Sequence, residues 1–132
     1  MPSDRKIAAD AIIIVKGKVL MMLRAQEPFS NHWVVPGGRI ELHEDIEECC
    51  KREIFEEVGL KIKIEKIVGI YSSPKRDPRQ TVAVAFLCTA KGKPRLSDEA
   101  LEIRFFDPKK LPKKVGFDHR KIIRDAIKLG KK

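Results

Sequence analysis

Residues 44–58 have the periodicity of one amphipathic helix, and this feature constrains the fold most strongly. Four residues of low polarity recur at spacings of three and four, namely Ile46, Cys49, Cys50 and Ile54. Such spacing places them on one side of a helix. Gly59 follows directly, where a helix commonly ends. This helix needs another element on which to bury its apolar side.

Strand-like apolar runs lie on both sides of this helix in the chain. They are Ile7 to Val15, Val19 to Leu23 and Trp33 to Val35 before it, and Ile62 to Tyr71, Thr81 to Ala90 and Ile103 to Phe106 after it. Lys16, Gly17 and Lys18 predict a hairpin between the first two runs. Pro36, Gly37 and Gly38 predict a tight bend after the third.

A second amphipathic helix is expected after Asp118, a candidate N-cap. Its predicted buried residues are Ile122, Ile123, Ala126 and Ile127. The order of the elements is strands, helix, strands, helix. This order predicts an α/β fold in which a mixed sheet has one helix packed on each face.

The 132 residues fit a single domain, residues 1–132, with no repeat or linker inside it. No apolar run approaches the ~20 residues of a membrane span, and no apolar signal core follows Met1. We therefore expect a soluble, cytoplasmic protein without a membrane partner. The three cysteines lack the spacing of a zinc site or a disulfide framework, which favours free buried thiols.

The formal net charge of +9 leaves two interpretations open, a soluble surface or an anionic partner. Charge alone specifies no ligand.

Three carboxylates share about one third of the circumference of the first helix. At 100° per residue, Glu53, Glu56 and Glu57 project close to the apolar stripe. Their charges repel, and burial makes an unpaired carboxylate costly. Three interpretations remain open: a divalent metal site, a structural ion-pair network and a solvated acidic face. Arg52 is the obvious protein cation, but we expect it to neutralise one of these carboxylates rather than all three.

The glycine bend adds to the metal interpretation. Gly37 and Gly38 let backbone groups approach a ligand closely, although an ordinary turn would use the same residues. Oxygen ligands favour Mg²⁺, Mn²⁺ or Ca²⁺ over zinc. An acidic helix beside such a bend fits metal-assisted attack on a phosphate ester or anhydride.

One segment matches a known family motif without a gap. Gly38, Glu44, Arg52, Glu53, Glu56, Glu57 and Gly59 stand at the fixed positions of G-x5-E-x7-R-E-U-x-E-E-x-G-U, in which Ile54 and Leu60 are the aliphatic positions. The chain thereby resembles the Nudix hydrolases. The resemblance implies an α/β/α sandwich and metal-dependent hydrolysis of a nucleoside diphosphate linked to another moiety.

Carried onto this sequence, the resemblance makes Glu53, Glu56 and Glu57 metal ligands, joined by the carbonyl of Gly37 or Gly38. Arg52 would orient a glutamate. The role of Glu44 stays open between metal binding through water and support of the loop. The implied cofactor is Mg²⁺, with Mn²⁺ as the alternative.

The general base varies among Nudix relatives between a box glutamate and an acid on a later loop. Asp98, Glu99 and Glu102 are the later candidates here, and we favour Glu99, because its spacing before the strand at 103–106 resembles that of some ADP-ribose-cleaving relatives. A solvent-facing loop acid is the alternative interpretation of Glu99.

Residues 71–79, Tyr-Ser-Ser-Pro-Lys-Arg-Asp-Pro-Arg, resemble a segment of small ADP-ribose pyrophosphatases. Arg76 and Arg79 would then suit the diphosphate, because guanidinium groups pair with phosphate oxygens in a bidentate manner. The sequence departs from the family pattern at two positions, of which the first weakens the substrate assignment and the second alters the loop before the motif glutamate. A histidine common after this segment is absent beside Gln80, and His43 replaces a common glycine.

Four further residues are candidate substrate contacts. Arg24 and Arg39 flank the expected cleft, while Trp33 and Phe117 could line a nucleotide pocket or pack into the core. The expected reaction converts ADP-ribose to AMP and ribose 5-phosphate. The alternatives are a hydrolase of oxidised guanine nucleoside triphosphates and a non-catalytic module that binds RNA or a nucleotide. We expect a small-molecule substrate rather than nucleic acid, and a monomer or a homodimer.

Overall fold

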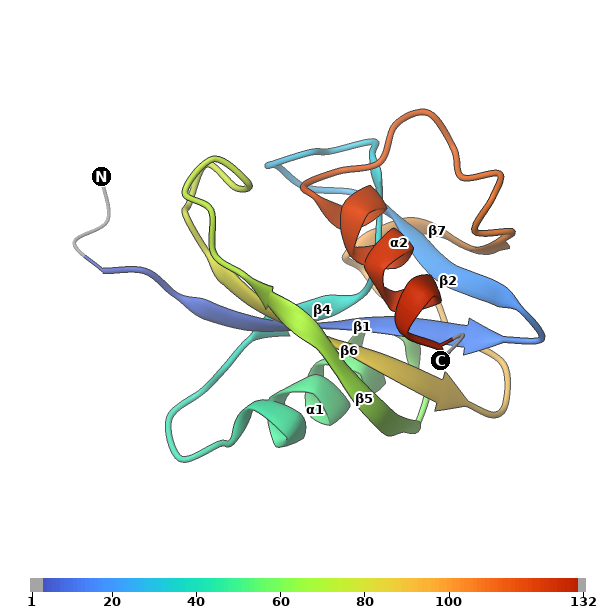
Figure 1. Ribbon diagram of the computed structural model, residues 1–132, viewed down its shortest axis with the longest axis horizontal. Coiled ribbons are helices and arrows are strands. Elements are labelled where there is room, and N and C mark those ends of the chain that lie inside the picture. Colours follow the sequence, from blue (N-terminus) through green and yellow to red (C-terminus); the bar gives the residue numbers. More distant parts are fainter. Residues whose placement is uncertain (1–3, 131–132) are drawn as a thin grey trace.

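Seven strands form one mixed sheet that lies between two helices (Figure 1). The structure is a computed structural model that describes residues 4–130. The strands are β1 (Ile7–Val15), β2 (Lys18–Arg24), β3 (Trp33–Val34), β4 (Gly37–Arg39), β5 (Ile62–Tyr71), β6 (Val82–Ala90) and β7 (Ala100–Phe106). The helices are α1 (Ile46–Val58) and α2 (His119–Gly130). The predicted α/β sandwich is confirmed.

The sheet is built around the parallel pair of β1 and β6, whose register runs from Ile7 opposite Val82 to Ile13 opposite Cys88. The strand order is β3-β2-β1-β6-β5, with β4 also pairing with β1 and β7 with β2. These other strand pairs are antiparallel. The parallel pair requires a long crossover, and α1 lies within that connection.

The first helix begins at Ile46, two residues later than the sequence predicts. Asp45 is its N-cap and forms a capping box with Glu48, in which each side chain accepts the other residue's backbone N–H. Gly59 ends the helix in the left-handed region at φ 71°, and its N–H donates to the carbonyl of Phe55. Both ends of α1 are therefore fixed by local sequence.

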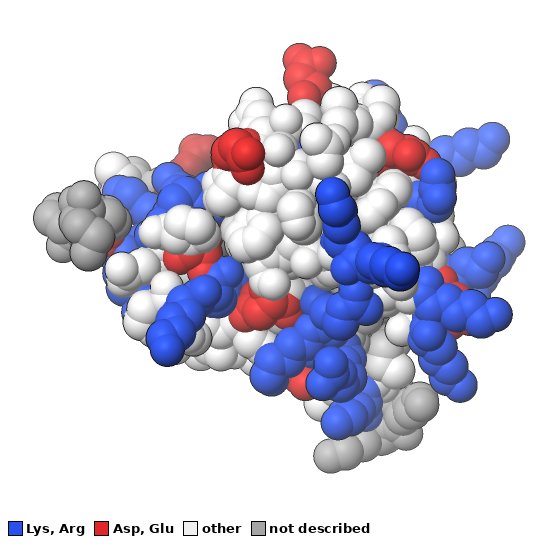
Figure 2. All heavy atoms as spheres, turned by 90° about the horizontal axis from the view of Figure 1, so that it is seen from above, with Lys and Arg blue, Asp and Glu red and all other residues white. Residues whose placement is uncertain are grey.

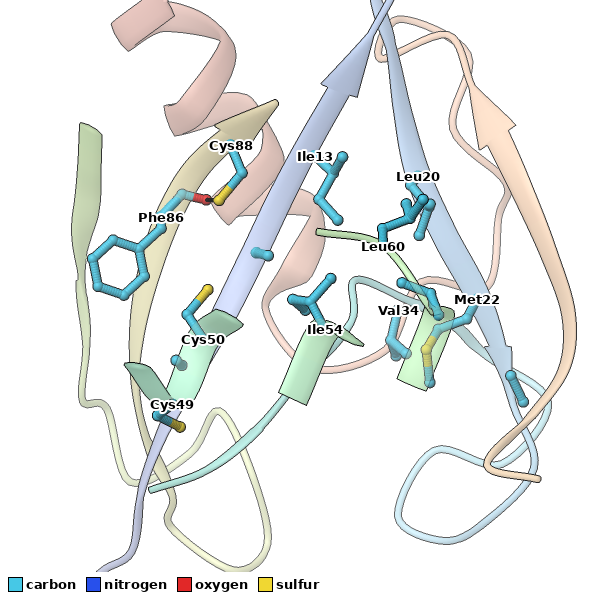
Figure 3. Close-up of a cluster of buried hydrophobic side chains, with 14 residues drawn as sticks. Ile13, Leu20, Met22, Val34, Cys49, Cys50, Ile54, Leu60, Phe86 and Cys88 are labelled. Carbon is cyan, nitrogen blue, oxygen red and sulfur yellow. Dashed lines mark hydrogen bonds between the residues drawn. The ribbon is translucent and has the colours of Figure 1, made fainter. Parts of the chain in front are cut away.

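Apolar side chains fill both sides of the sheet. Ile13 lies in the cluster beneath α1, whereas its neighbour Ile12 lies in the cluster beneath α2, as the alternation of a strand requires. Figure 3 shows the α1-side cluster, in which Ile54 of the helix faces the strands. Ile122 and Ile123 of α2 are buried on the other side, as predicted.

The three cysteines are free, buried thiols, as predicted, and they belong to the α1-side cluster (Figure 3). Burial raises the pKa of the Cys49 thiol to about 11. The thiols thus behave as small apolar core groups.

Two local predictions need correction. The segment after Pro36 is not only a bend, because Gly37–Arg39 continues as β4 and pairs with Ala8 to Asp10 of β1. Asp118 directly precedes α2, but its carboxylate binds Arg76. Within residues 4–130, no helix has the length and apolar character of a membrane span.

Candidate active site

Two glycines let the β4 backbone lie close to neighbouring elements. A Cβ on Gly37 would overlap the carbonyl oxygen of Ala9 and the side chain of Asp10. A Cβ on Gly38 would overlap the carboxylate of Glu53 from α1. The first glycine therefore allows strand pairing with β1, and the second leaves space that an α1 carboxylate fills.

Glu57 joins α1 to this glycine segment. The backbone N–H of Gly37 donates to Glu57 Oε1 at 2.7 Å, and Glu57 is only 6% exposed. Burial is the main reason that the pKa of Glu57 lies well above its usual range, and a hydrogen bond with Glu99 raises it further. Among the described residues Glu57 has no ion-pair partner. It is thus a buried carboxylate whose charge the protein's own cations leave unpaired.

Glu99 reaches this carboxylate from the loop before β7. Its backbone carbonyl accepts a hydrogen bond from the N–H of Ala25 at 3.2 Å, which ties the loop to the end of β2. The charge of Glu99 also contributes to the raised pKa of Glu53, for which burial is again the largest cause. Glu53, Glu57 and Glu99 therefore form one electrostatically coupled group. Glu99 was the favoured general base through the resemblance to ADP-ribose-cleaving relatives, and that role stays a prediction.

Arg52 holds the outer carboxylates of α1. Its guanidinium donates to Glu44 at 2.6 Å, to Glu53 at 3.1 Å and to Glu56 at 3.1 Å, and also to the carbonyl of Arg39. The hydrogen bond to Glu44 is the largest cause of the raised pKa of Arg52, and it lowers the pKa of Glu44 in turn. Of the three carboxylates Glu53, Glu56 and Glu57, Arg52 therefore contacts two rather than the one expected, and Glu57 is left without it. Its other carboxylate partners are Glu44 and Glu41.

A pocket opens beside Glu57, between the ends of the strands and the start of α2. Arg24, Arg79 and Phe117 line it together with Gly38 and Glu57. The guanidinium carbons of Arg24 and Arg79 lie 5.5 and 5.8 Å from the centroid of the Phe117 ring. Burial lowers the pKa of Arg24, and repulsion from Arg79 adds to this effect. Two like charges that converge in a pocket favour an anionic ligand.

Arg76 is a buried support of this pocket. Its guanidinium makes a two-pronged interaction with Asp118 at 3.0 and 2.8 Å and also donates to the carbonyl of Thr81. A carboxylate oxygen of Asp10 lies 3.9 Å from it. Arg76 thus joins the 72–80 loop to the start of α2 and to β1.

His119 extends the same buried network toward the glycine segment. Its Nδ1 accepts the backbone N–H of Val35 at 3.0 Å, so a neutral ring carries its proton on Nε2. That Nε2 lies 3.4 Å from Asp10. Asp10 and His119 were not predicted as site residues. A lone aspartate between apolar strand residues was the available signal for Asp10.

The remaining candidate residues lie at or outside the edge of the pocket. Arg39 and Arg76 line it. Trp33 is packed at 4.9 Å against Phe106 in the α2-side cluster. Glu102 pairs with Arg104 at the surface, and Asp98 is exposed. Among the predicted site residues, the pocket is thus lined by Gly38, Glu57, Arg24, Arg39, Arg76, Arg79 and Phe117. Arg52, Glu53 and Glu56 lie beside it on α1, Glu99 is an exposed residue of the loop before β7, and Trp33 and the other loop acids do not line it.

Comparison with known proteins identifies the family. Residues 4–126 match the NUDIX domain. The chain belongs to the Nudix family. It is 41% identical over 124 residues to an ADP-ribose pyrophosphatase of Methanocaldococcus jannaschii, spanning 92% of this chain and 73% of that protein. This likeness and the intact motif make the protein a Nudix hydrolase.

Solved structures share the fold at lower identity. A MutT NUDIX hydrolase of Burkholderia pseudomallei has a TM-score of 0.86 at 23% identity, with 93% of this chain and 98% of that chain covered. A bifunctional NMN adenylyltransferase/ADP ribose pyrophosphatase of Francisella tularensis, complexed with AMP and a Mn ion, has a TM-score of 0.82 at 23% identity. The match covers 96% of this chain and 42% of that one.

The Nudix glutamates fit a divalent ion by their chemistry. Their donor atoms are carboxylate oxygens next to the peptide carbonyls of a glycine segment, which is the ligand type that Mg²⁺ and Mn²⁺ prefer. Within residues 4–130, no three acidic, histidine or cysteine side chains converge on one point as a ready metal site. Glu53 and Glu56 bond Arg52 instead, while Glu57 faces Gly37 and Glu99.

We expect replacement of Gly37 and of Gly38 by alanine to lower the free energy of unfolding by different amounts. Gly37→Ala should lower the free energy of unfolding by about 1–3 kcal/mol, because the new methyl group meets fixed backbone of β1. Gly38→Ala meets only the movable end of Glu53, so it should cost less stability while displacing that carboxylate. Urea unfolding of both variants measures the difference. Equal losses would contradict the contacts described.

We expect the ionised carboxylate of Asp77 to stabilise the fold at neutral pH and to lose this effect in acid. Burial alone would raise the pKa of Asp77, but hydrogen bonds from the side chain and backbone of Arg79 outweigh burial and hold that pKa below its usual range. The resulting stability is present above the pKa of an unfolded aspartate, ~3.9, and is lost as the pH falls through the lower folded value. Asp77→Asn should therefore be less stable than the parent at pH 6.

The measurement is the urea midpoint of both proteins between pH 6 and the lowest pH at which both fold. The gap between their midpoints should narrow below about pH 4. A gap that stays constant over this range would show that ionised Asp77 does not stabilise the fold.

Proposed function

We propose that this Nudix hydrolase cleaves the diphosphate of ADP-ribose to AMP and ribose 5-phosphate. The observation that carries the proposal is the position of Glu57. This buried carboxylate forms no ion pair among the described residues, contacts a second carboxylate, and lines the same pocket as Arg24 and Arg79. One end of the pocket thus suits a metal ion and the other an anion.

The cofactor in this proposal is Mg²⁺, with Mn²⁺ as the alternative. Glu53, Glu56, Glu57 and the carbonyl of Gly38 would hold it, all of which offer oxygen donors. A bound divalent ion offsets phosphate charge and lowers the pKa of a coordinated water. The Mn ion in the Francisella tularensis complex supports this choice of ion.

The acidic and basic side chains of the pocket have separate parts in the reaction. Glu99 accepts the proton as water attacks one phosphorus, a new P–O bond forms, and the bond from that phosphorus to the bridging oxygen breaks. Arg52 positions Glu53 and Glu56 without contacting the substrate. Arg24 and Arg79 hold the diphosphate oxygens, and Arg39 contributes from the rim.

The organic part of the substrate has its own contacts. The Phe117 ring offers a face for the adenine base within the pocket. Trp33 is half-buried between β3 and Phe106, so any contact with the base comes from its exposed edge. Arg76 acts by positioning, because its guanidinium donates from all three nitrogens to Asp118 and Thr81.

The choice of ADP-ribose rests on the 41% identical relative from Methanocaldococcus jannaschii, which is named for that activity. A small-molecule substrate also fits a pocket that two arginines and one aromatic ring line at close range. We propose a cytoplasmic enzyme that acts as a monomer or a homodimer.

Glu57→Gln tests the central role in this proposal. The variant keeps an oxygen that can accept the N–H of Gly37 but removes the negative charge. With Mg²⁺ and ADP-ribose, kcat should fall by about 10² to 10⁴. Glu47→Gln is the matched control, because Glu47 is an exposed acid on the same helix. Full activity of Glu57→Gln would contradict the proposal.

A substrate panel distinguishes the alternatives in the same assay. AMP and ribose 5-phosphate should be the products from ADP-ribose. Preferred turnover of an oxidised deoxyguanosine triphosphate would make the enzyme a nucleotide-pool hydrolase instead. No metal-dependent product from any nucleotide would favour a binding module.

Arg24→Gln tests the anion side of the pocket. A hydrogen bond to a charged group contributes about 1.5–3 kcal/mol, so kcat/KM for ADP-ribose should fall by a factor of about 10 to 100, mainly through KM. Arg104→Gln is the control, because Arg104 lies over Trp33 and Phe106 and does not line the pocket. An equal loss in both variants would show a general charge effect rather than a diphosphate contact.

A further inference from the structure

The last part of the described chain, residues 107–130, is rich in basic residues and is separate in sequence from the carboxylates of α1. Residues 107–130 contain eight Lys and Arg residues against three Asp residues. All eight side chains are on exposed residues: Lys109, Lys110, Lys113, Lys114, Arg120, Lys121, Arg124 and Lys128. We call their surface the C-terminal basic face. In Figure 2, Lys and Arg side chains crowd the lower and right-hand parts of the view, and a smaller group lies at the left.

The three acids of this segment do not neutralise the face. Asp107 accepts the backbone N–H of Lys109. The carboxylate of Asp118 accepts hydrogen bonds from the guanidinium of Arg76. Asp125 accepts from Tyr71 and pairs with Lys121. In the described part of the chain, none of the other seven cations forms a side-chain ion pair. Their charges are therefore available to an external anion.

Part of this face is a groove between the 107–118 segment and α2. Lys109, Arg120, Arg124 and Lys128 are its charged lining residues, and no acid lines it. Arg120, Arg124 and Lys128 recur every four residues on one side of the helix, so they are about 6 Å apart along its axis. Arg120 also donates to the carbonyls of Pro112 and Lys113, which fixes one wall of the groove to the other. Such a row of cations matches a chain of regularly spaced negative charges.

Leu111, Ile123 and Ile127 also line the groove, but none of them is a large exposed apolar residue of the kind that a membrane or a protein partner would use. The large exposed apolar residues of the described chain lie elsewhere, from Ile7 to Leu101 in the sequence. The apolar side of α2 is buried against the sheet through Ile122, Ile123 and Ala126. A membrane-surface helix inserts an apolar side, and protein interfaces depend on large apolar or aromatic anchors. Rows of exposed lysines and arginines are typical of contacts to phosphates.

We propose that the C-terminal basic face binds a single strand of nucleic acid through its phosphates, independently of base sequence. The face is separate from the catalytic pocket, since none of its cations lines that pocket. It therefore adds a second binding activity to the hydrolase. The sequence alone did not lead us to expect a nucleic-acid partner, because it does not show that the excess charge is concentrated on one face.

The test measures binding of a fluorescein-labelled oligouridylate by fluorescence anisotropy at several salt concentrations. The variant combines Lys109→Gln, Arg124→Gln and Lys128→Gln, which removes three groove cations whose side chains form no hydrogen bond within the described residues. Its Kd at low salt should rise by about tenfold or more. The slope of log K against log salt should become shallower by about 2, since each phosphate contact on a single strand contributes about 0.7.

The matched control combines Lys61→Gln, Lys91→Gln and Lys93→Gln, which removes the same charge from exposed positions outside the face. It should bind the oligonucleotide like the parent protein. Equal weakening by both triple variants would overturn the proposal, because binding would then follow net charge alone. Unchanged affinity in the groove variant would overturn it as well.

Two further readouts distinguish other uses of the face. Hydrolysis of ADP-ribose by the groove variant should stay within about twofold of the parent, so this test is independent of the proposed function. A fall in kcat/KM at low salt with no change in oligonucleotide affinity would show that the face steers small anions instead. Binding to vesicles of anionic phospholipid but not to the oligonucleotide would replace the proposal with a membrane contact.

Discussion

The hydrogen bond from the Gly37 N–H to Glu57 is the interaction on which the site depends. It fixes the buried carboxylate of α1 to a segment that is itself paired with β1. Val35, two residues earlier, is held by His119 at the start of α2. The same short stretch of backbone therefore joins both helices to the middle of the sheet. Functional side chains held by such a stretch have their positions set by sheet and helix contacts rather than by a free loop.

Local sequence predicted the parts of this fold that local chemistry determines. The apolar periodicity of α1 and the glycine at its end identified the helix, and the spacing of its glutamates identified the acidic cluster. The fixed positions of the family motif then gave those glutamates their expected roles. Arg52 was predicted to pair with one carboxylate of the cluster. A helix projection gives only the direction of each side chain, so it does not show that one guanidinium donates to Glu44, Glu53 and Glu56 at the same time.

Contacts between residues far apart in the chain could not be predicted in the same way. Arg76 looks like a phosphate ligand in a basic loop, yet it is buried against Asp118 and near Asp10. Nothing in its neighbours specifies those partners, because they are 42 and 66 residues away. The pairing of Gly37–Arg39 with β1 is likewise a tertiary feature. Trp33 was a candidate both for a nucleotide pocket and for packing against the sheet, and its strand position packs it on Phe106.

Charge is divided between the two helical layers of the molecule. The acidic side chains on and before α1 are held by Arg52. On α2, cations without an ion-pair partner among the described residues are exposed on the side opposite its buried apolar residues. A negatively charged substrate is repelled by bare carboxylates, so in the proposed reaction a divalent cation would offset the charge of the acidic layer. The basic layer has no such requirement. Under the two proposals, the same chain binds anions on two surfaces, of which only one depends on metal.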